Sequence, residues 1–172
     1  MEKYDWAEFT KTINIKADIQ DVYDLFSTRS GMESWFLRTC EYKDPNENIC
    51  SDDQLVETGY FYTWRWYGWS DEVEENGKIL QANGTNFFEY SFDGNGATNM
   101  IVTVTIEEEE AECLVHLKQR NIPTDEHGKS HWHLGCAAGW TFYLANLKSI
   151  LEGGIDLRNR NPKYLKHKVI NS

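Results

Sequence analysis

The stretch Tyr60-Phe61-Tyr62-Thr63-Trp64-Arg65-Trp66-Tyr67-Gly68-Trp69 places seven aromatic residues in ten positions. Aromatic side chains fit a pleated, partly buried surface, so the run predicts a β-strand over 60–69. Successive strand residues point to opposite faces, which separates Tyr60, Tyr62, Trp64 and Trp66 from the rest of the run. The opposite face contains a threonine and an arginine and is expected to be the wetter one. The first face is an apolar wall, which the chain itself, a small molecule or another protein is expected to cover.

The composition is that of a folded, globular chain. A length of 172 residues is most simply one domain, and a domain of this size buries roughly 70% of its unfolded surface. Aromatic residues make up 14% of the chain, which argues against disorder. We expect residues 1–172 to form a single domain with a core over about 9–154 and a basic tail over 155–172.

The charge is strongly negative. Lys and Arg total 17 and Asp and Glu total 28, which gives a net charge of −11. An acidic surface repels phosphate backbones, so no nucleic-acid partner is expected. The sequence also contains no apolar run of about 18 residues, so no membrane insertion is expected.

The cysteines and the first residues bear on the compartment. The opening Met1-Glu2-Lys3-Tyr4-Asp5 does not resemble a signal peptide. The four cysteines, Cys40, Cys50, Cys113 and Cys136, form no CxxC pair. They are expected to be small buried apolar residues in a reducing compartment, so the prediction is a cytoplasmic protein.

Apolar and polar residues alternate in several further segments. Strands are predicted over 9–15, 38–43, 78–82, 87–92, 100–106 and 113–119. Asn76-Gly77 and Asn83-Gly84 predict tight turns. The acidic stretch 107–112 predicts the solvated tip of a hairpin and not a metal site. The polar stretch 44–57 predicts an exposed loop.

Helical spacing appears at two places. Two short helices are predicted after the first strand, one following Asp18 as its N-cap and one over 30–37. From about Ser130 apolar residues recur every three or four positions, which predicts one long amphipathic helix ending at Gly153-Gly154. Its stripe contains Trp132, Cys136, Trp140, Tyr143, Leu144, Leu147 and Leu151. The elements together predict an α+β fold, in which a strongly curved antiparallel sheet of about six to seven strands wraps around the long C-terminal helix.

The helix sequence Gly139-Trp140-Thr141-Phe142-Tyr143-Leu144-Ala145-Asn146-Leu147-Lys148-Ser149-Ile150-Leu151-Glu152-Gly153-Gly154 carries a family resemblance, supported by Trp35-Phe36 and Gly59-Tyr60. It resembles the C-terminal helix of homologues of the activator of the heat-shock chaperone ATPase (the AHSA type). These belong to the START-like, birch-pollen-allergen-like (SRPBCC) superfamily. The resemblance covers about residues 9–154 and implies the helix-grip fold, with a deep cavity between the long helix and the sheet. It implies no shared catalytic residue, because the superfamily includes lipid and hormone carriers, polyketide cyclases and hydroxylase domains.

The interior between sheet and helix is the first candidate site. Strand parity places the inward rings of 60–69 together with those of 87–92 and the helix stripe, with Trp35 closing one end. The candidate lining residues are Trp35, Tyr62, Trp64, Trp66, Phe88, Tyr90, Phe92, His116, Trp140, Tyr143 and Leu144. Two interpretations stay open: the rings pack into a solid core, or they enclose a ligand cavity with a few polar groups.

The histidines and the acid–base residues are weaker candidates. His127, His131 and His133 lie near the start of the long helix, but the spacing lacks a recognisable zinc pattern, so no metal and no cofactor is expected. Glu89 and Arg65 share the outer parity, which predicts a cross-strand surface pair. No GxSxG motif, Cys–His signature or phosphate-binding glycine loop is present, so no catalytic residue is assigned and an enzyme is disfavoured.

Three functions follow, in order of preference. The first is binding or carriage of a small hydrophobic or aromatic molecule, such as a lipid. The second is a co-chaperone-like protein partner, bound through the acidic surface or the outer rings Phe61, Tyr67 and Trp69. The third is a cyclase- or hydrolase-like enzyme that uses His116 or a tyrosine of the cavity as acid or base.

Overall fold

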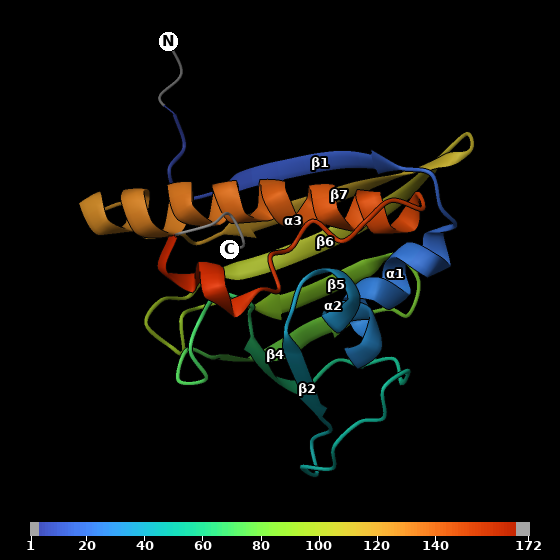
Figure 1. The fold of residues 1–172 in the computed structure, drawn as a ribbon, viewed down its shortest axis with the longest axis horizontal. Coiled ribbons are helices and arrows are strands. Elements are labelled where there is room, and N and C mark those ends of the chain that lie inside the picture. Colours follow the sequence, from blue (N-terminus) through green and yellow to red (C-terminus); the bar gives the residue numbers. More distant parts are fainter. Residues whose placement is uncertain (1–3, 168–172) are drawn as a thin grey trace.

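A curved antiparallel sheet, covered on one face by a long helix, forms the body of the computed structural model, which describes residues 4–167 (Figure 1). The sheet has seven strands in the order β1-β7-β6-β5-β4-β3-β2. The strands are β1 Phe9–Ile15, β2 Thr39–Lys43, β3 Phe61–Arg65, β4 Glu75–Ala82, β5 Phe87–Ser91, β6 Ile101–Glu109 and β7 Glu112–Arg120. This is the predicted α+β helix-grip architecture.

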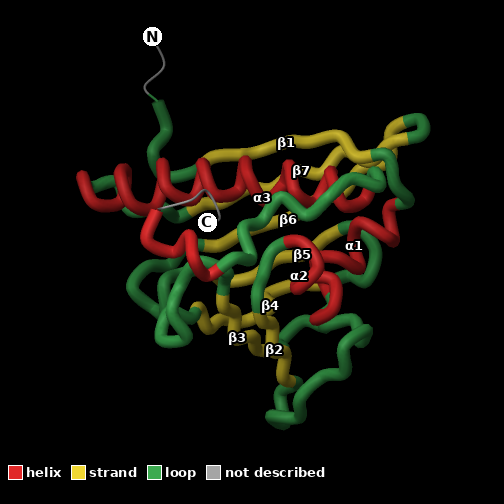
Figure 2. The backbone as a smooth tube through the Cα atoms, viewed as in Figure 1, coloured by secondary structure: helices red, strands yellow, loops and turns green. Residues whose placement is uncertain are grey.

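The helices follow the predicted order. They are α1 Ile19–Ser27, α2 Arg29–Trp35, the π-helical segment η1 Gly128–Leu134, α3 Gly135–Leu151 and the 3₁₀ segment η2 Pro162–His167. The backbone of α3 packs against β1 and α2, and α2 also packs against β2 (Figure 2). Because β1 and β2 are opposite edges of the sheet, α1 and α2 carry the chain from one edge to the other. No helix within residues 4–167 is long and apolar enough to cross a membrane.

Burial alternates along the strands as the pleat requires. In β3 the side chains of Tyr62 and Trp64 are 3% and 0% exposed, and in β5 Phe88 and Tyr90 are 0% and 1% exposed. Phe61 on the other parity is 44% exposed. The inward rings therefore face the helix side of the sheet, as strand parity predicts.

The aromatic stretch is only partly a strand. β3 ends at Arg65, and residues 66–74 form the loop to β4. The tight turn predicted at Asn76-Gly77 is wrong, because both residues lie inside β4, with Gly77 opposite Tyr62. Gly77 is needed there for space: a Cβ atom at this position would overlap the Tyr62 ring. The turn predicted at Asn83-Gly84 is confirmed, with Gly84 at a φ of +80°.

The ends of several elements differ by a few residues from the prediction. The acidic hairpin turns at Glu110, with a φ of 57°, and residues 107–109 belong to β6. Asp18 precedes α1, but its side chain makes no capping hydrogen bond. The long helix begins as η1 and ends before Gly153, which adopts a φ of +78°. The loop 44–57 is exposed apart from Cys50 and Val56, which anchor it in the core.

We predict that Gly77→Ala destabilises the protein by about 1–3 kcal/mol, because the new methyl group displaces the Tyr62 ring from the core. Urea unfolding measures the change. Gly135→Ala is the matched control: a Cβ atom there meets nothing within 4 Å, and alanine favours the helix. Equal stability of the two variants would contradict the close packing of Tyr62 on Gly77.

Candidate functional site

A cluster of aromatic rings joins α3 to the sheet, and Phe36 is at its centre. The Phe36 ring stacks on Trp140 of α3, with centroids 5.0 Å apart and planes 25° apart. Its edge contacts are Tyr143 at 4.8 Å, Trp66 at 5.7 Å and Trp64 at 5.9 Å. One ring that follows α2 therefore contacts both the helix and the aromatic strand.

The wall on the sheet side is continuous. Tyr62 stacks on Trp64 with centroids 3.7 Å apart, and Trp64 meets the Tyr90 ring edge-on at 5.1 Å. Phe92 lies 6.3 Å from Tyr90 and 5.8 Å from Trp140. Such pairs add about 0.5–1.5 kcal/mol each beyond the area they bury. The rings thus fill the space between sheet and helix by contacting one another.

Most of the sequence-predicted lining residues meet in this cluster. Trp35 stacks on Phe36 at 5.2 Å, and Leu144 is 2% exposed within the same core. Phe88 lies farther along β5 and contacts Tyr90 and the ring of Tyr23. The prediction did not include Phe36. It lies inside the helix predicted over 30–37, whereas α2 ends at Trp35, so the predicted helical pattern did not give the direction of this ring.

His116 lies apart from the cluster. Its ring hydrogen-bonds Thr12 through Nδ1 at 2.9 Å, and Nε2 is 3.8 Å from the Glu107 carboxylate. Both contacts lie on the outer face of the sheet, because the flanking residues Val115 and Leu117 occupy the inner face. His116 is therefore left out of the candidate site.

The cluster approaches the surface at one end. Trp66, Phe92 and Cys136 are only partly buried, where the loops 66–74 and 93–98 meet the start of α3. The ring centroids of Trp66 and Phe92 are 6.4 Å apart, so the two rings are neighbours at this end. We call this end the mouth of the ring cluster.

Buried polar groups surround the same end. Gln119 is fully buried, accepts a hydrogen bond from the Trp140 indole at 2.9 Å and donates to Met100 Sδ at 3.3 Å. Burial raises the pKa of the Cys136 thiol to about 11, which keeps it protonated at neutral pH. The Glu75 carboxylate is 8% exposed and accepts a hydrogen bond from the Gly94 backbone N–H at 2.8 Å. Burial raises its pKa more than this bond lowers it.

The buried indole N–H of Trp64 has no hydrogen-bond partner within the described residues. It lies close to the Cys40 thiol and lowers the pKa of that thiol slightly, whereas burial raises the same pKa by more. An unpaired buried donor costs free energy, so an acceptor brought to it would be stabilised.

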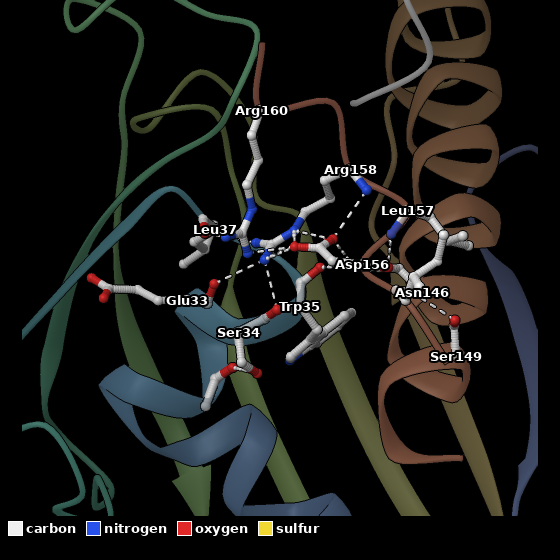
Figure 3. Close-up of polar contacts among 12 residues, drawn as sticks. Glu33, Ser34, Trp35, Leu37, Asn146, Ser149, Asp156, Leu157, Arg158 and Arg160 are labelled. Carbon is white, nitrogen blue, oxygen red and sulfur yellow. Dashed lines mark hydrogen bonds and ion pairs between the residues drawn. The ribbon is translucent and has the colours of Figure 1, made fainter. Parts of the chain in front are cut away.

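A segment after α3 closes the side of the site; we call residues 155–160 the strap (Figure 3). The side chain of Arg158 is completely buried, and its Nη2 lies 2.8 Å from Asp156 Oδ2. It donates to the carbonyl oxygens of Ser34 at 2.6 Å, Leu37 at 2.8 Å and Glu33 at 3.1 Å. These carbonyls lie at the C-terminal end of α2, where helix carbonyls lack intrahelical partners and attract cations.

Asn146 links α3 to both the strap and α2. Its side-chain NH₂ donates to the Trp35 carbonyl at 2.7 Å and to Asp156 at 3.2 Å, and its oxygen accepts from the Leu157 backbone N–H at 2.7 Å (Figure 3). Burial acts to raise the pKa of Asp156, but the hydrogen bonds and charges of Arg158 and Arg160 lower it to about 2. Asp156 is therefore charged at neutral pH, as the ion pair requires.

The strap also holds the loop beside the mouth. The guanidinium carbons of Arg158 and Arg160 each lie 5.4 Å from the centroid of the Tyr67 ring. Tyr67 follows Trp66 directly in the chain. Tyr67 is thus not one of the free outer rings that the sequence suggested, because cation–π contacts bind it to the strap.

One other prediction concerns a pair of charged residues outside the cluster. The predicted surface pair Glu89–Arg65 is wrong, because β4 separates their strands. Arg65 pairs with Glu74, and Glu89 pairs with Arg120 at 3.1 Å.

The histidines near α3 divide into two environments. The exposed His127 and His131 rings stack 4.9 Å apart, whereas His133 is buried and bonded to the Tyr4 hydroxyl and the Trp6 carbonyl. Within residues 4–167, no three or more His, Cys, Asp or Glu side chains are grouped to hold a metal ion.

Comparisons with known proteins agree with this fold. The family model described as "Activator of Hsp90 ATPase homolog 1-like protein" matches residues 16–152. A search of curated proteins finds no match. The solved structure of protein SSP2350 from Staphylococcus saprophyticus is similar, with a TM-score of 0.66 and 19% identity over 88% of this chain and 96% of that one.

Two further solved structures are similar. The Aha1 dimer from Colwellia psychrerythraea has a TM-score of 0.65 and 18% identity over 86% of this chain and 97% of that one. Protein CV1439 from Chromobacterium violaceum has a TM-score of 0.62 and 17% identity over 85% and 98%. Likeness at these identities shows the fold alone.

We predict that Glu75→Gln stabilises the protein at neutral pH. The pKa of Glu75 is raised from its ordinary value of 4.5, so the stability associated with its protonated form is lost as the pH rises through the folded-state pKa. The glutamine variant avoids this loss, and its advantage is expected at pH 7 but not at pH 4.

Urea unfolding at both pH values, with the exposed Glu72→Gln as control, measures the difference. A Glu75→Gln variant that is less stable than the parent by the same amount at both pH values would show that burial of the charge is not the dominant effect.

Proposed function

The chain belongs to the family of activator of Hsp90 ATPase homolog 1-like proteins, and we propose that it binds a small aromatic or other apolar molecule between the sheet and α3. The observation that carries the proposal is the ring cluster with a partly exposed mouth. Trp66 and Phe92 are half-buried there, and Phe36 and Trp140 lie behind them.

The geometry favours a planar ligand. Phe36 and Trp140 are stacked nearly parallel, so a flat ring system that enters at the mouth replaces one ring contact with another of similar energy. The ligand pockets of proteins are mostly apolar with few polar groups, which is the character of this cluster.

One polar group narrows the ligand class further. The unpaired indole N–H of Trp64 favours a ligand that carries a hydrogen-bond acceptor. A planar apolar molecule with one or more acceptors meets this condition. The proposed carrier is a cytoplasmic protein of one domain. Its four free cysteines support a reducing compartment.

We predict that native mass spectrometry with aromatic polyketides, fatty acids and sterol-like compounds detects a one-to-one complex with a member of the aromatic class. Trp66→Ala is expected to weaken binding at least tenfold, about 1.4 kcal/mol, because it removes a ring at the mouth. Phe61→Ala is the matched control, since Phe61 lies on the outer face of β3, the strand that precedes Trp66, and is 44% exposed.

Failure of all three classes to bind the parent protein would refute the proposal. Equal loss of affinity in Trp66→Ala and Phe61→Ala would place the binding site elsewhere.

A protein partner is the second candidate, and the outer face of the sheet favours it. Phe61 and Trp69 are 44% and 50% exposed. A hollow of about 450 Å³ lies beside Phe61 on the face of β2, β3 and β4, and Lys78 Nζ is 5.6 Å from the Phe61 ring centroid. Exposed apolar residues mark an interaction surface when they form a contiguous patch.

The family name suggests an Hsp90 chaperone as the protein to test. Under this second candidate, the protein raises the ATPase rate of an Hsp90 chaperone and the double variant Phe61→Ala, Trp69→Ala does not. An unchanged ATPase rate with the parent protein would reject this candidate and leave the ligand-binding proposal intact.

A further inference from the structure

We propose that the strap, residues 155–160, is a releasable lid that holds the loop 66–74 beside the mouth and controls access to the ring cluster. The lid is a property of the free protein. Its role as a gate for a ligand rests on the proposed function.

The attachment of the strap is polar, and Arg158 makes more of its hydrogen bonds than any other side chain. Asn146 also bonds Asp156 and Leu157, and Ser149 bonds the Ile155 carbonyl. Arg158 makes hydrogen bonds to three backbone carbonyls at the end of α2, and Asp156 accepts hydrogen bonds from its Nε and Nη2. The side chain is fully buried although the strap itself runs along the surface. Removal of one partner from such a buried pair leaves an uncompensated charge or several unpaired carbonyls, so the attachment depends on the intact set.

The apolar side chains of the strap contribute little to its attachment. Ile155 is 75% exposed and Leu157 is 43% exposed. Segments with few buried apolar contacts open at low free energy while the core stays folded. We therefore expect the strap to detach when the contacts of Arg158 are lost, because the bonds to Asn146 and Ser149 that remain are few.

Detachment of the strap bears directly on the ring cluster. Arg158 bonds the carbonyls on both sides of Trp35 and Phe36. Its charge also lies close to Tyr143: burial raises the pKa of that phenol, and Arg158 lowers it by a smaller amount. On its other side it contacts Tyr67 together with Arg160. Loss of the strap thus uncovers the junction of α2 and α3 and frees Tyr67, the neighbour of Trp66.

The loop 66–74 keeps other anchors when the strap opens. Arg38 Nη2 lies 2.5 Å from Asp71 Oδ1, and Arg65 pairs with Glu74. Both pairs are at the base and middle of the loop, so the freed part is the segment around Tyr67 and Trp69. The expected motion is a local opening next to the mouth and not a separation of β3 from β4.

Amide hydrogen exchange of Arg158→Ala tests the proposal, with Lys163→Ala as the control for loss of an exposed cation in the same tail. The amides of Leu157 and Arg158, which are bonded to Asn146 and Asp156, are expected to exchange at least tenfold faster in Arg158→Ala. The amides of β6 and β7 are expected to keep the rates of the parent protein. A uniform acceleration that includes β6 and β7 would overturn the proposal, because it would make Arg158 a support of the whole fold.

Access to the rings is measured separately by acrylamide quenching of tryptophan fluorescence. Both proteins carry Trp69→Phe, because Trp69 is 50% exposed and would dominate the signal. The quenching constant is expected to rise at least twofold in Arg158→Ala. Faster strap exchange without increased quenching would overturn the proposal, because the strap would then open without uncovering the rings.

A second variant, Asp156→Asn, keeps the size of the side chain and removes its ion pairs with Arg158 and Arg160. If Arg158→Ala does not fold, the same two measurements on Asp156→Asn decide the question. Neither measurement contains a ligand, so the lid can be confirmed in a protein that binds none of the tested compounds. Where a ligand does bind, Arg158→Ala is expected to speed its association at least threefold.

Discussion

The stack of Phe36 between Trp140 and the aromatic strand is the contact on which the arrangement of helix and sheet depends. The backbone of α3 approaches β1, at one edge of the sheet, whereas β3 near the other edge is reached through side chains. Inward residues of β6 and β7 are of moderate size, such as Val104 and Leu117, but those of β3 and β5 are large rings. Curvature of the sheet explains this difference, because smaller side chains on β3 would leave voids that close packing does not tolerate. The large inward rings of β3 and β5 therefore help to fill the space between the sheet and α3.

The alternation of apolar and polar residues and the helical spacing were sufficient to predict the strands and helices of this fold. They also identified the inward rings of β3 and β5. They failed where no period applies. Phe36 lies between a helix end and a strand, so neither pattern indicates its direction. Gly77 resembled a turn residue because its neighbour is an asparagine, whereas its real role is to leave room for the Tyr62 ring across the strand pair. His116 was misplaced for a simpler reason: Val115 and Leu117 on either side already occupied the inner parity.

The strap was invisible to sequence reasoning because its partners are distant in the chain. Arg158 belongs to a basic tail, and charged residues in tails are usually solvated. Its burial depends on carbonyl oxygens of residues 33, 34 and 37, more than 120 positions earlier. Every residue has a backbone carbonyl, so the sequence does not show which carbonyls bind Arg158, and no motif marks this site. The strap nevertheless lies directly against the ring cluster, since Arg158 bonds the chain on both sides of Trp35 and Phe36.

A double-mutant cycle between Phe36 and Trp140 is the most direct test of this account. Free energies of unfolding are measured for the parent, Phe36→Leu, Trp140→Leu and the double variant, so that the pair contact is separated from the loss of each ring. If the stack joins helix and sheet, the two substitutions are coupled by about 0.5–1.5 kcal/mol, the energy of an aromatic pair beyond its buried area. Additive effects, with a coupling below about 0.3 kcal/mol, would contradict the central place of Phe36.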